Sequence, residues 1–144
     1  IFNILLGITK MDTGKLFINH GGTKSIGIGS LPIHQRCSEN QIKFIPQYDS
    51  VVRNLNVEDK LRAVAEIFLK DRRERDEKIE NLLSEFSLTE QRTTFAHSLS
   101  GGQNKKVAIC RALIGECRIM VLDEPLSNID PITIEMIKDV IVKL

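Results

Sequence analysis

The sequence lacks a strong charge imbalance, a long apolar run and a paired cysteine motif, and each absence excludes a class of protein. Its 20 Lys and Arg residues against 19 Asp and Glu provide no net field to attract nucleic acid or an acidic membrane surface. No apolar run approaches the roughly 20 residues of a membrane-spanning helix, so direct membrane insertion is not expected. Cys37, Cys110 and Cys117 show no Cys-x-x-Cys spacing and follow no secretory leader, which favours a reducing cytoplasm.

What is present suits one soluble domain or part of a larger one, since the 144 residues are 42% hydrophobic. Residues 1–8 already follow an apolar helical rhythm, with no Ser, Thr or Asp before them to cap a helix. At the other end, a helical stripe of Ile134, Ile137, Ile141 and Leu144 continues without a Gly or Asn stop signal. Both ends are therefore expected to be cuts inside helices.

The first third of the sequence predicts short elements separated by turns. Residues 12–14 form a turn, and residues 15–19 alternate like a short strand. The glycines that follow lack the setting of a dinucleotide fingerprint and are interpreted as loop glycines: Gly21, Gly22, Gly27 and Gly29. Residues 42–45 predict a strand stopped by Pro46, which places Gln47 where a strand gives way to a loop.

The remainder predicts helices and one buried strand, and hence an α/β fold. Residues 57–69 and 79–86 each repeat apolar residues at helical spacing. The mixed charges of residues 70–78 between them are typical of a solvated helical hairpin. A third helix is predicted from Ser100, because Ser-x-x-Gln matches a capping box. Residues 119–122 are continuously apolar, which is typical of a parallel strand buried on both faces.

A phosphate site is predicted at the start of the third helix. Ser100, Gly101, Gly102 and Gln103 place a hydroxyl and two residues without side chains on its first turn. Backbone N–H groups and the positive end of the helix can therefore approach an anion closely. Taken alone, the same residues also fit an ordinary helix start.

Two carboxylates follow the buried strand, at the strand end where open α/β sheets bind ligands. In phosphoryl transfer, Asp123 would hold the water shell of Mg²⁺, and Glu124 would orient or deprotonate the attacking water. The amide of Gln47 could reach a Mg²⁺-bound water. Alone, the two acids also fit a helix cap, and Gln47 fits an ordinary loop glutamine.

Read together, these residues resemble the ATPase domains of ABC transporters over essentially the whole chain. Residues 99–103 resemble the signature motif of the family, residues 119–124 its Walker B strand with the catalytic glutamate, and Gln47 its Q-loop. Residues 127–130 are similar to its D-loop, whose aspartate, here Asp130, contacts the opposite subunit. The resemblance implies a P-loop NTPase-like fold with a mainly parallel core sheet and an α-helical signature subdomain.

The resemblance also implies a division of the chain and a set of ligands. Residues 1–47 would belong to the core up to the Q-loop, residues 48–115 to the helical subdomain with the signature motif, and residues 116–144 to the Walker B strand, the D-loop and the next helix. ATP and Mg²⁺ would be bound in a head-to-tail dimer. In that dimer the signature helix contacts the γ-phosphate of the partner's ATP, whereas the Q-loop and Walker B residues serve their own subunit. Asp130 and Gln103 would complete the nucleotide site.

Within the family, residues 30–34, 53–61 and 130–138 most resemble the ATPases of bacterial lipopolysaccharide-export transporters. The region after Gln47 would receive a transmembrane permease, at the cytoplasmic face of the inner membrane. Branched-chain amino-acid importers share part of the pattern. A non-catalytic docking module, or the relic of a broken gene, also stays open. A repair ATPase is disfavoured, because repair-type members place a long coiled coil where this chain has a short helical pair.

The family's Gly-x-x-x-x-Gly-Lys-[Ser/Thr] loop, its Walker A motif, is absent from these residues and is expected just before Ile1. The switch histidine is expected beyond Leu144, because His20, His34 and His97 lie in other places. We therefore expect an active intact parent, whereas the segment alone should bind ATP weakly and hydrolyse it negligibly.

Overall fold

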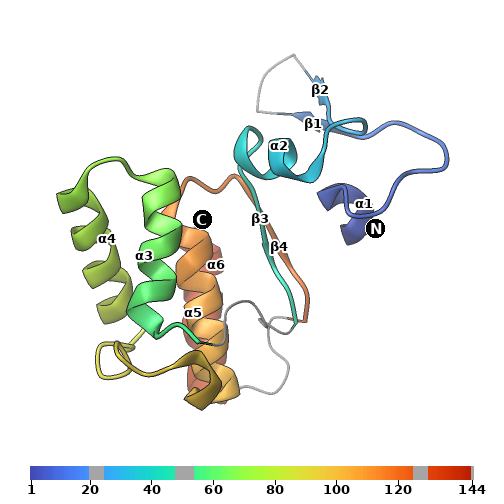
Figure 1. The fold of residues 1–144 in the computed structure, drawn as a ribbon. Coiled ribbons are helices and arrows are strands. Elements are labelled where there is room, and N and C mark those ends of the chain that lie inside the picture. Colours follow the sequence, from blue (N-terminus) through green and yellow to red (C-terminus); the bar gives the residue numbers. More distant parts are fainter. Residues whose placement is uncertain (20–24, 48–53, 125–129, 144) are drawn as a thin grey trace. The chain divides into compact units, whose positions relative to one another are not determined.

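The computed structural model describes residues 1–19, 25–47, 54–124 and 130–143. The chain divides into two compact units (Figure 1). The first unit comprises Ile1–Phe44 with Cys117–Val121, and the second comprises Ile45–Glu116 with Leu122–Leu144. The division falls at the carboxyl ends of two strands, so that the residues that follow these strands belong to the second unit.

The first unit contains two short helices and a hairpin. Helix α1 (Phe2–Leu6) ends at Gly7, whose φ of 82° lies in the left-handed region that glycine adopts without penalty. Strands β1 (Phe17–Asn19) and β2 (Ser25–Gly27) pair antiparallel, with Ile18 opposite Ile26. Helix α2 (Ile33–Ser38) follows Pro32 and precedes the longer strands.

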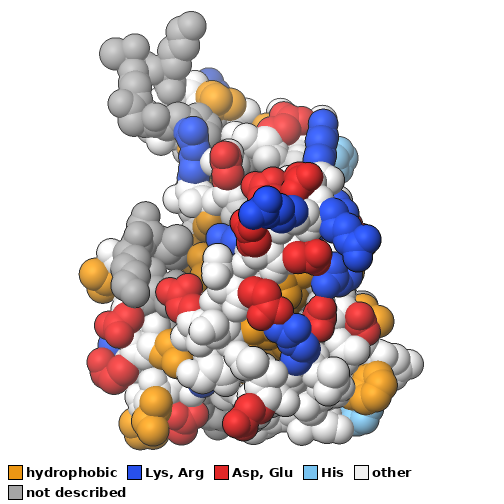
Figure 2. All heavy atoms as spheres, turned by 90° about the vertical axis from the view of Figure 1, so that its left-hand side faces the viewer, with side chains coloured by type: hydrophobic (Ala, Val, Ile, Leu, Met, Phe, Trp, Pro, Cys, Tyr) orange, Lys and Arg blue, Asp and Glu red, His pale blue; other side chains and the backbone are white. Residues whose placement is uncertain are grey.

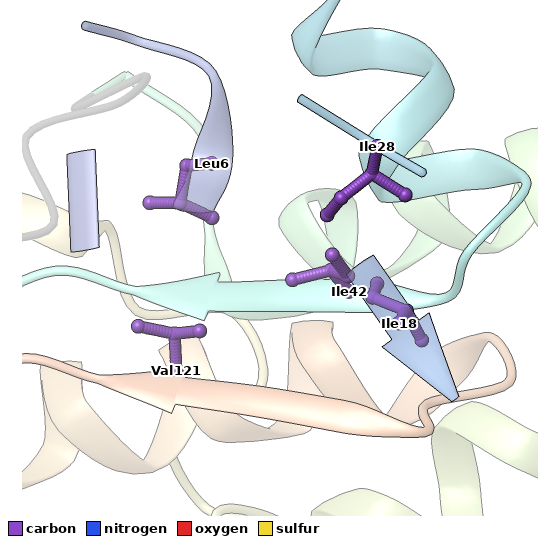
Figure 3. Close-up of a cluster of buried hydrophobic side chains, with 5 residues drawn as sticks. All are labelled: Leu6, Ile18, Ile28, Ile42 and Val121. Carbon is purple, nitrogen blue, oxygen red and sulfur yellow. The ribbon is translucent and has the colours of Figure 1, made fainter. Parts of the chain in front are cut away.

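Strands β3 (Ile42–Ile45) and β4 (Ile119–Leu122) run parallel to each other. The carbonyl of Gln41 accepts a hydrogen bond from Arg118 N at 3.0 Å, and that of Ile45 accepts one from Asp123 N at 3.0 Å, so the register advances in one direction. The core of the first unit packs around these strands. Figure 3 shows its five central side chains: Leu6, Ile18, Ile28, Ile42 and Val121.

A buried guanidinium holds the segments of the first unit together. Arg36 of α2 is only 4% exposed. Its Nη1 donates to Ile4 O at 2.5 Å and to Leu5 O at 2.9 Å, while Nε donates to Leu31 O and Nη2 to Gly29 O, each at 2.7 Å. A buried charge of this kind is tolerated only when its donors are satisfied. Here the acceptors are main-chain carbonyls, two of them in the last turn of α1.

The second unit is helical, and its first two helices begin with side-chain caps. Asn56 caps α3 (Val57–Phe68) by accepting a hydrogen bond from Asp59 N, and Asp71 caps α4 (Arg72–Glu85) by accepting one from Glu74 N. After the 3₁₀ turn η1 (Ala96–Ser98) come α5 (Gly101–Ile114) and α6 (Pro131–Lys143). Within the described ranges, no helix is long and apolar enough to cross a membrane.

Helix α5 is the centre of the second unit and contacts α3, α4 and α6 (Figure 1). Its buried residues lie on most of its circumference, as expected of a helix that packs against several neighbours. The other helices each turn a buried face towards this core, through Val57, Leu61 and Ala65 on α3 and through Ile79 and Leu83 on α4.

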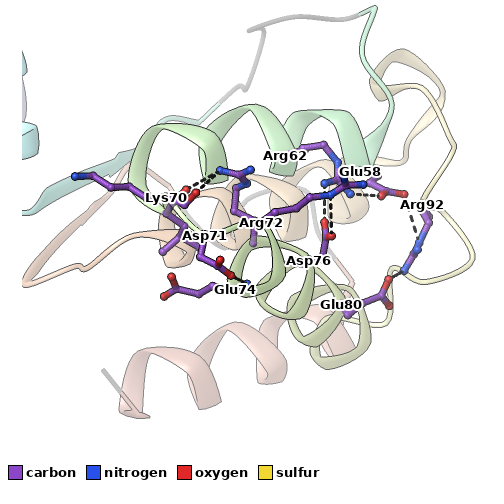
Figure 4. A network of polar contacts seen from close by, with 11 residues as sticks. Glu58, Arg62, Lys70, Asp71, Arg72, Glu74, Asp76, Glu80 and Arg92 are labelled. Carbon is purple, nitrogen blue, oxygen red and sulfur yellow. Dashed lines mark hydrogen bonds and ion pairs between the residues drawn. The ribbon is translucent and has the colours of Figure 1, made fainter.

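Ion pairs link α3 and α4 on the surface. Arg62 donates to Glu58 at 2.8 Å and to Asp76 at 2.6 Å, while Arg92 pairs with Glu80 (Figure 4). The hydrogen bond to Glu58, followed by that to Asp76, raises the pKa of Arg62. Acidic and basic side chains are interspersed on the face seen in Figure 2, so this surface forms no patch of one sign.

The structure corrects four details of the sequence-based prediction. The second of the two predicted helices begins at Arg72, before residue 79, because Asp71 caps a helix there. Gly27 lies in β2, not in a loop. The first helix ends at Leu6, before Ile8, because Gly7 adopts a left-handed conformation. In β4 only Val121 is fully buried, since the described part of the sheet gives this strand one neighbour.

Candidate functional site

The predicted Q-loop and Walker B residues come together at the carboxyl ends of β3 and β4. Gln47 follows β3, and Asp123 and Glu124 follow β4. Gln47 Nε2 donates a hydrogen bond to Glu124 Oε2 at 2.5 Å, although the two residues are 77 positions apart. Because Asp123 N is bonded to Ile45 O, the end of one strand is fixed against the end of the other. This is the sheet edge at which open α/β folds bind ligands.

Glu124 has an unusual backbone conformation. Its φ of 45° lies in the left-handed region, which costs a residue with a β-carbon about 1–2 kcal/mol. Its side chain is exposed, whereas those of Asp123 and Gln47 are half-buried. The carboxylate of Glu124 is therefore accessible to a water molecule or a substrate while the amide of Gln47 restrains it.

The predicted signature residues form the first turn of α5, and both halves of the predicted capping box are confirmed. Gln103 N donates to Ser100 Oγ at 3.2 Å, and Ser100 N donates to Gln103 Oε1 at 2.9 Å. Gly101 is exposed and Gly102 is buried. The reciprocal bonds fix the turn, and the exposed glycine leaves the helix start open to an anion.

Asp130 occupies the cap position of α6, directly before Pro131. Its carboxylate accepts hydrogen bonds from Thr133 N at 2.9 Å and from Thr133 Oγ1 at 2.7 Å. These two bonds, the one from the hydroxyl first, lower the pKa of Asp130. The other predicted D-loop residues, 127–129, lie outside the described residues, as do residues 48–53 after the Q-loop.

Lys105, which lies one turn beyond Gly101 on α5, is not among the site residues predicted from the sequence. Its side chain is buried, at 6% exposure, and Nζ is 3.2 Å from Pro46 O and 3.5 Å from Gln47 O. A lysine on a helix is usually solvated, so no sequence pattern marks this contact. Lys105 thus links α5, which bears the predicted signature residues, to the main chain at the predicted Q-loop residue Gln47.

Comparisons with known proteins agree with this arrangement. The family model described as ABC transporter matches residues 1–127. The lipopolysaccharide export system ATP-binding protein LptB of Haemophilus influenzae is 36% identical over 145 residues, covering 99% of this chain and 57% of that protein. The protein of the same name from Acidithiobacillus ferridurans is 38% identical over 133 residues, covering 92% and 53%. The chain thus spans little more than half the length of these curated relatives.

A solved structure supports the fold independently. The dimeric post-hydrolysis structure of the ATP-binding cassette MJ0796, bound to ADP and Pi, matches with a TM-score of 0.78 and 22% identity, covering 99% of this chain and 62% of that one. At this identity the similarity concerns the fold alone, and it confirms the predicted α/β, P-loop NTPase-like class. Together with the family model, it shows that the chain belongs to the ABC transporter family and has the fold of that family's ATP-binding cassettes.

Proposed function

We propose that the chain is the part of an ABC transporter's ATPase subunit that contains the Q-loop, the signature motif and the Walker B carboxylates. The observation that supports this most directly is the hydrogen bond between Gln47 and Glu124, with Asp123 beside them at the carboxyl ends of two parallel strands. An amide that follows β3 thus contacts an exposed acid that follows β4, and a second acid directly precedes that acid in the chain. Hydrolysis of a phosphoanhydride needs such a group to orient water.

In this proposal Glu124 is the general base. Its exposed carboxylate accepts the proton of the attacking water, while the amide of Gln47 holds the carboxylate in place at 2.5 Å. A positioned general base contributes on the order of 10² to 10⁴ in rate. The left-handed backbone of Glu124 fits such a role, since strained conformations cluster at functional sites.

The donor set fits Mg²⁺. The carboxylate of Asp123 and the amide oxygen of Gln47 are hard oxygen ligands of the kind that Mg²⁺ prefers. Among the described residues, no group of three or more His, Cys, Asp and Glu is placed to hold a metal. Mg²⁺ usually relies instead on one or two carboxylates, several waters and the substrate phosphates. When bound, it would neutralise charge on the transferred phosphoryl group.

The start of α5 would act in trans. We assign Ser100, Gly101 and Gly102 to the γ-phosphate of ATP held by a second ATPase subunit in a head-to-tail dimer, with Gln103 keeping the turn in shape. The early N–H groups of a helix have no intrahelical acceptor and can bind an anion. Asp130 would contact the same partner. The dimeric state of MJ0796 supports this assignment by analogy.

The transport role follows from the relatives. Because the two LptB proteins match this chain at 36% and 38% identity, we assign it to a lipopolysaccharide exporter. The permease would dock on the region after Gln47, which places the subunit at the cytoplasmic face of the inner membrane.

The catalytic proposal is tested on the full-length product of the gene that encodes this chain. Glu124→Gln should lower kcat for ATP hydrolysis on the order of 10² to 10⁴ while the Kd for ATP stays within about twofold, because the amide keeps the shape and loses the base. The matched control is Glu90→Gln, an exposed acid in the turn after α4, which should leave kcat unchanged. An unaltered rate in Glu124→Gln would refute the assignment.

The cargo is tested separately, with the product purified together with the membrane proteins that accompany it. Stimulation of ATP hydrolysis by lipopolysaccharide in vesicles is expected. Stimulation by branched-chain amino acids and their binding protein instead would contradict lipopolysaccharide export, although the proposal of an ATPase subunit would still stand.

A further inference from the structure

Lys105 makes a contact in the second unit that packing alone does not explain. Its ammonium group is buried, and burial of a charge is unfavourable unless hydrogen bonds compensate. The carbonyls of Pro46 and Gln47, at 3.2 and 3.5 Å, provide acceptors. These are the residues at which β3 ends and the Q-loop begins.

A continuous set of polar contacts leads from Lys105 to the candidate base. Nζ of Lys105 holds the main chain of Gln47, and the side chain of Gln47 holds the carboxylate of Glu124 at 2.5 Å. A shift of the Gln47 main chain would therefore displace its amide and release Glu124. Helix α5 contains both Lys105 and the signature residues. A shift of this helix would therefore change the orientation of the Glu124 carboxylate.

Residues 55–57, which follow the Q-loop in the chain, are also bonded to the region that contains the signature residues. Val57 N donates to Thr94 O at 3.1 Å, and Ala96 N donates to Leu55 O at 3.2 Å. Residues 55–57 are thus bonded by their main chain to residues 94–96, which lead into the signature turn. Lys105 thus contacts residues 46–47, and backbone bonds join residues 55–57 to the residues just before the signature turn.

We propose that Lys105 is a positioning residue that couples the placement of the signature helix to the orientation of Glu124 in the same subunit. The inference rests on the proposed ATPase function and concerns how the proposed hydrolysis site is regulated. In a dimer, the signature helix engages the partner's ATP, so Lys105 would make hydrolysis in one site depend on nucleotide in the other.

The test uses Lys105→Met in the full-length gene product, with Lys105→Arg as the conservative variant. Methionine keeps the length and apolar stem of lysine and removes the donors, whereas arginine keeps a charge that can reach the carbonyls. For Lys105→Met, kcat should fall roughly 10- to 100-fold, within what a positioned base contributes, with KM changed less than about twofold. Lys105→Arg should regain most of the rate. Lys70→Met, the same change at an exposed lysine after α3, should retain it fully.

A double variant separates positioning from a general structural role. If Lys105 acts through the base, Lys105→Met should lower the residual rate of Glu124→Gln by less than about twofold, because effects of residues that act as a unit are not additive. Multiplicative effects, or a full rate in Lys105→Met alone, would overturn the proposal.

The remaining outcomes are equally decisive. If Lys105→Met does not fold, Lys105→Gln must show the same loss of kcat at unchanged KM. Failure of both to fold while Lys105→Arg folds would make Lys105 structural and overturn its positioning role. A wild-type product that hydrolyses no ATP overturns the proposed function and this inference together. An active wild type with an equally active Lys105→Met overturns the inference alone.

Discussion

Replacement of Arg36 by methionine should be among the most damaging single changes to the first unit. The substitution keeps much of the apolar stem and removes every donor of a side chain that is 4% exposed. It deprives carbonyls of Ile4, Leu5, Gly29 and Leu31 of a charged hydrogen-bond donor. Two of these carbonyls belong to α1 and two to the segment before α2, so one side chain secures three parts of the chain.

The expected loss of unfolding free energy depends on which carbonyls retain another hydrogen-bond donor. Ile4 O retains a second donor, Gly7 N at 3.1 Å, and is affected least. A fully buried acceptor left without a partner costs about 1–3 kcal/mol. The other three carbonyls belong to half-buried residues, so about 3–9 kcal/mol is an upper range for their sum. Relaxation towards water and relief of the buried charge favour the lower part of that range, about 3–5 kcal/mol. Whole domains are stable by only about 5–15 kcal/mol.

Arg73→Met is the matched control. Arg73 lies on α4, its side chain is 87% exposed, and its Nε is 2.9 Å from Glu77 one turn away. Such a pair contributes at most about 1 kcal/mol. Urea unfolding of the full-length gene product compares the two variants. Hydrogen exchange adds a local measure at the amides of Ile8 and Thr9, both bonded to Asn3 O, where about 3 kcal/mol corresponds to roughly 100-fold faster exchange. Equal stability of the two variants would refute the reasoning.

The other predictions concern single groups and the chain as a whole. Hydrogen bonds from Thr133 lower the pKa of Asp130 in the folded protein. The ionised cap should therefore contribute fully to the free energy of unfolding above the ordinary pKa of about 4, and this contribution should be lost as the pH falls through the lower pKa of the folded state. Urea titrations against Asp130→Ala should therefore converge in acid. Burial raises the pKa of the Cys110 thiol, so iodoacetamide at about pH 8 should label half-buried Cys37 and Cys117 first, as read by mass spectrometry; equal rates would contradict the packing. The 144 residues alone, which contain no Walker A motif, should bind ATP weakly and hydrolyse it negligibly, and tight binding in equilibrium dialysis would contradict the first expectation.

The parts of the fold that the sequence predicts well depend on neighbours only a few positions apart. The capping box of Ser100 and Gln103 is one case, because both hydrogen bonds span three residues. The strands at Ile42–Ile45 and Ile119–Leu122 are another, since each is a short β-prone run ended by a clear change of residue type.

Helix α2 shows what local patterns miss. It has no side-chain cap, and Ile33 at its start is 44% exposed, so neither a capping motif nor an apolar stripe marks it. Its main buried side chain is Arg36, a residue type that patterns place in solvent. The bonds that bury Arg36 reach back 31 and 32 positions to α1, and no window of neighbouring residues contains that information.

For the candidate site, residue types indicated the chemistry, but the geometry of Glu124 is set from elsewhere in the fold. A φ of 45° is disfavoured for glutamate, so its own local preference would not select this conformation. It persists because the preceding residue is bonded to Ile45 O and the carboxylate to Gln47, both at the end of β3. Gln47 is held in turn by Lys105 from α5. The position of the Glu124 carboxylate therefore depends on contacts with β3 and, through Gln47, with α5, so a shift of either element would move the carboxylate.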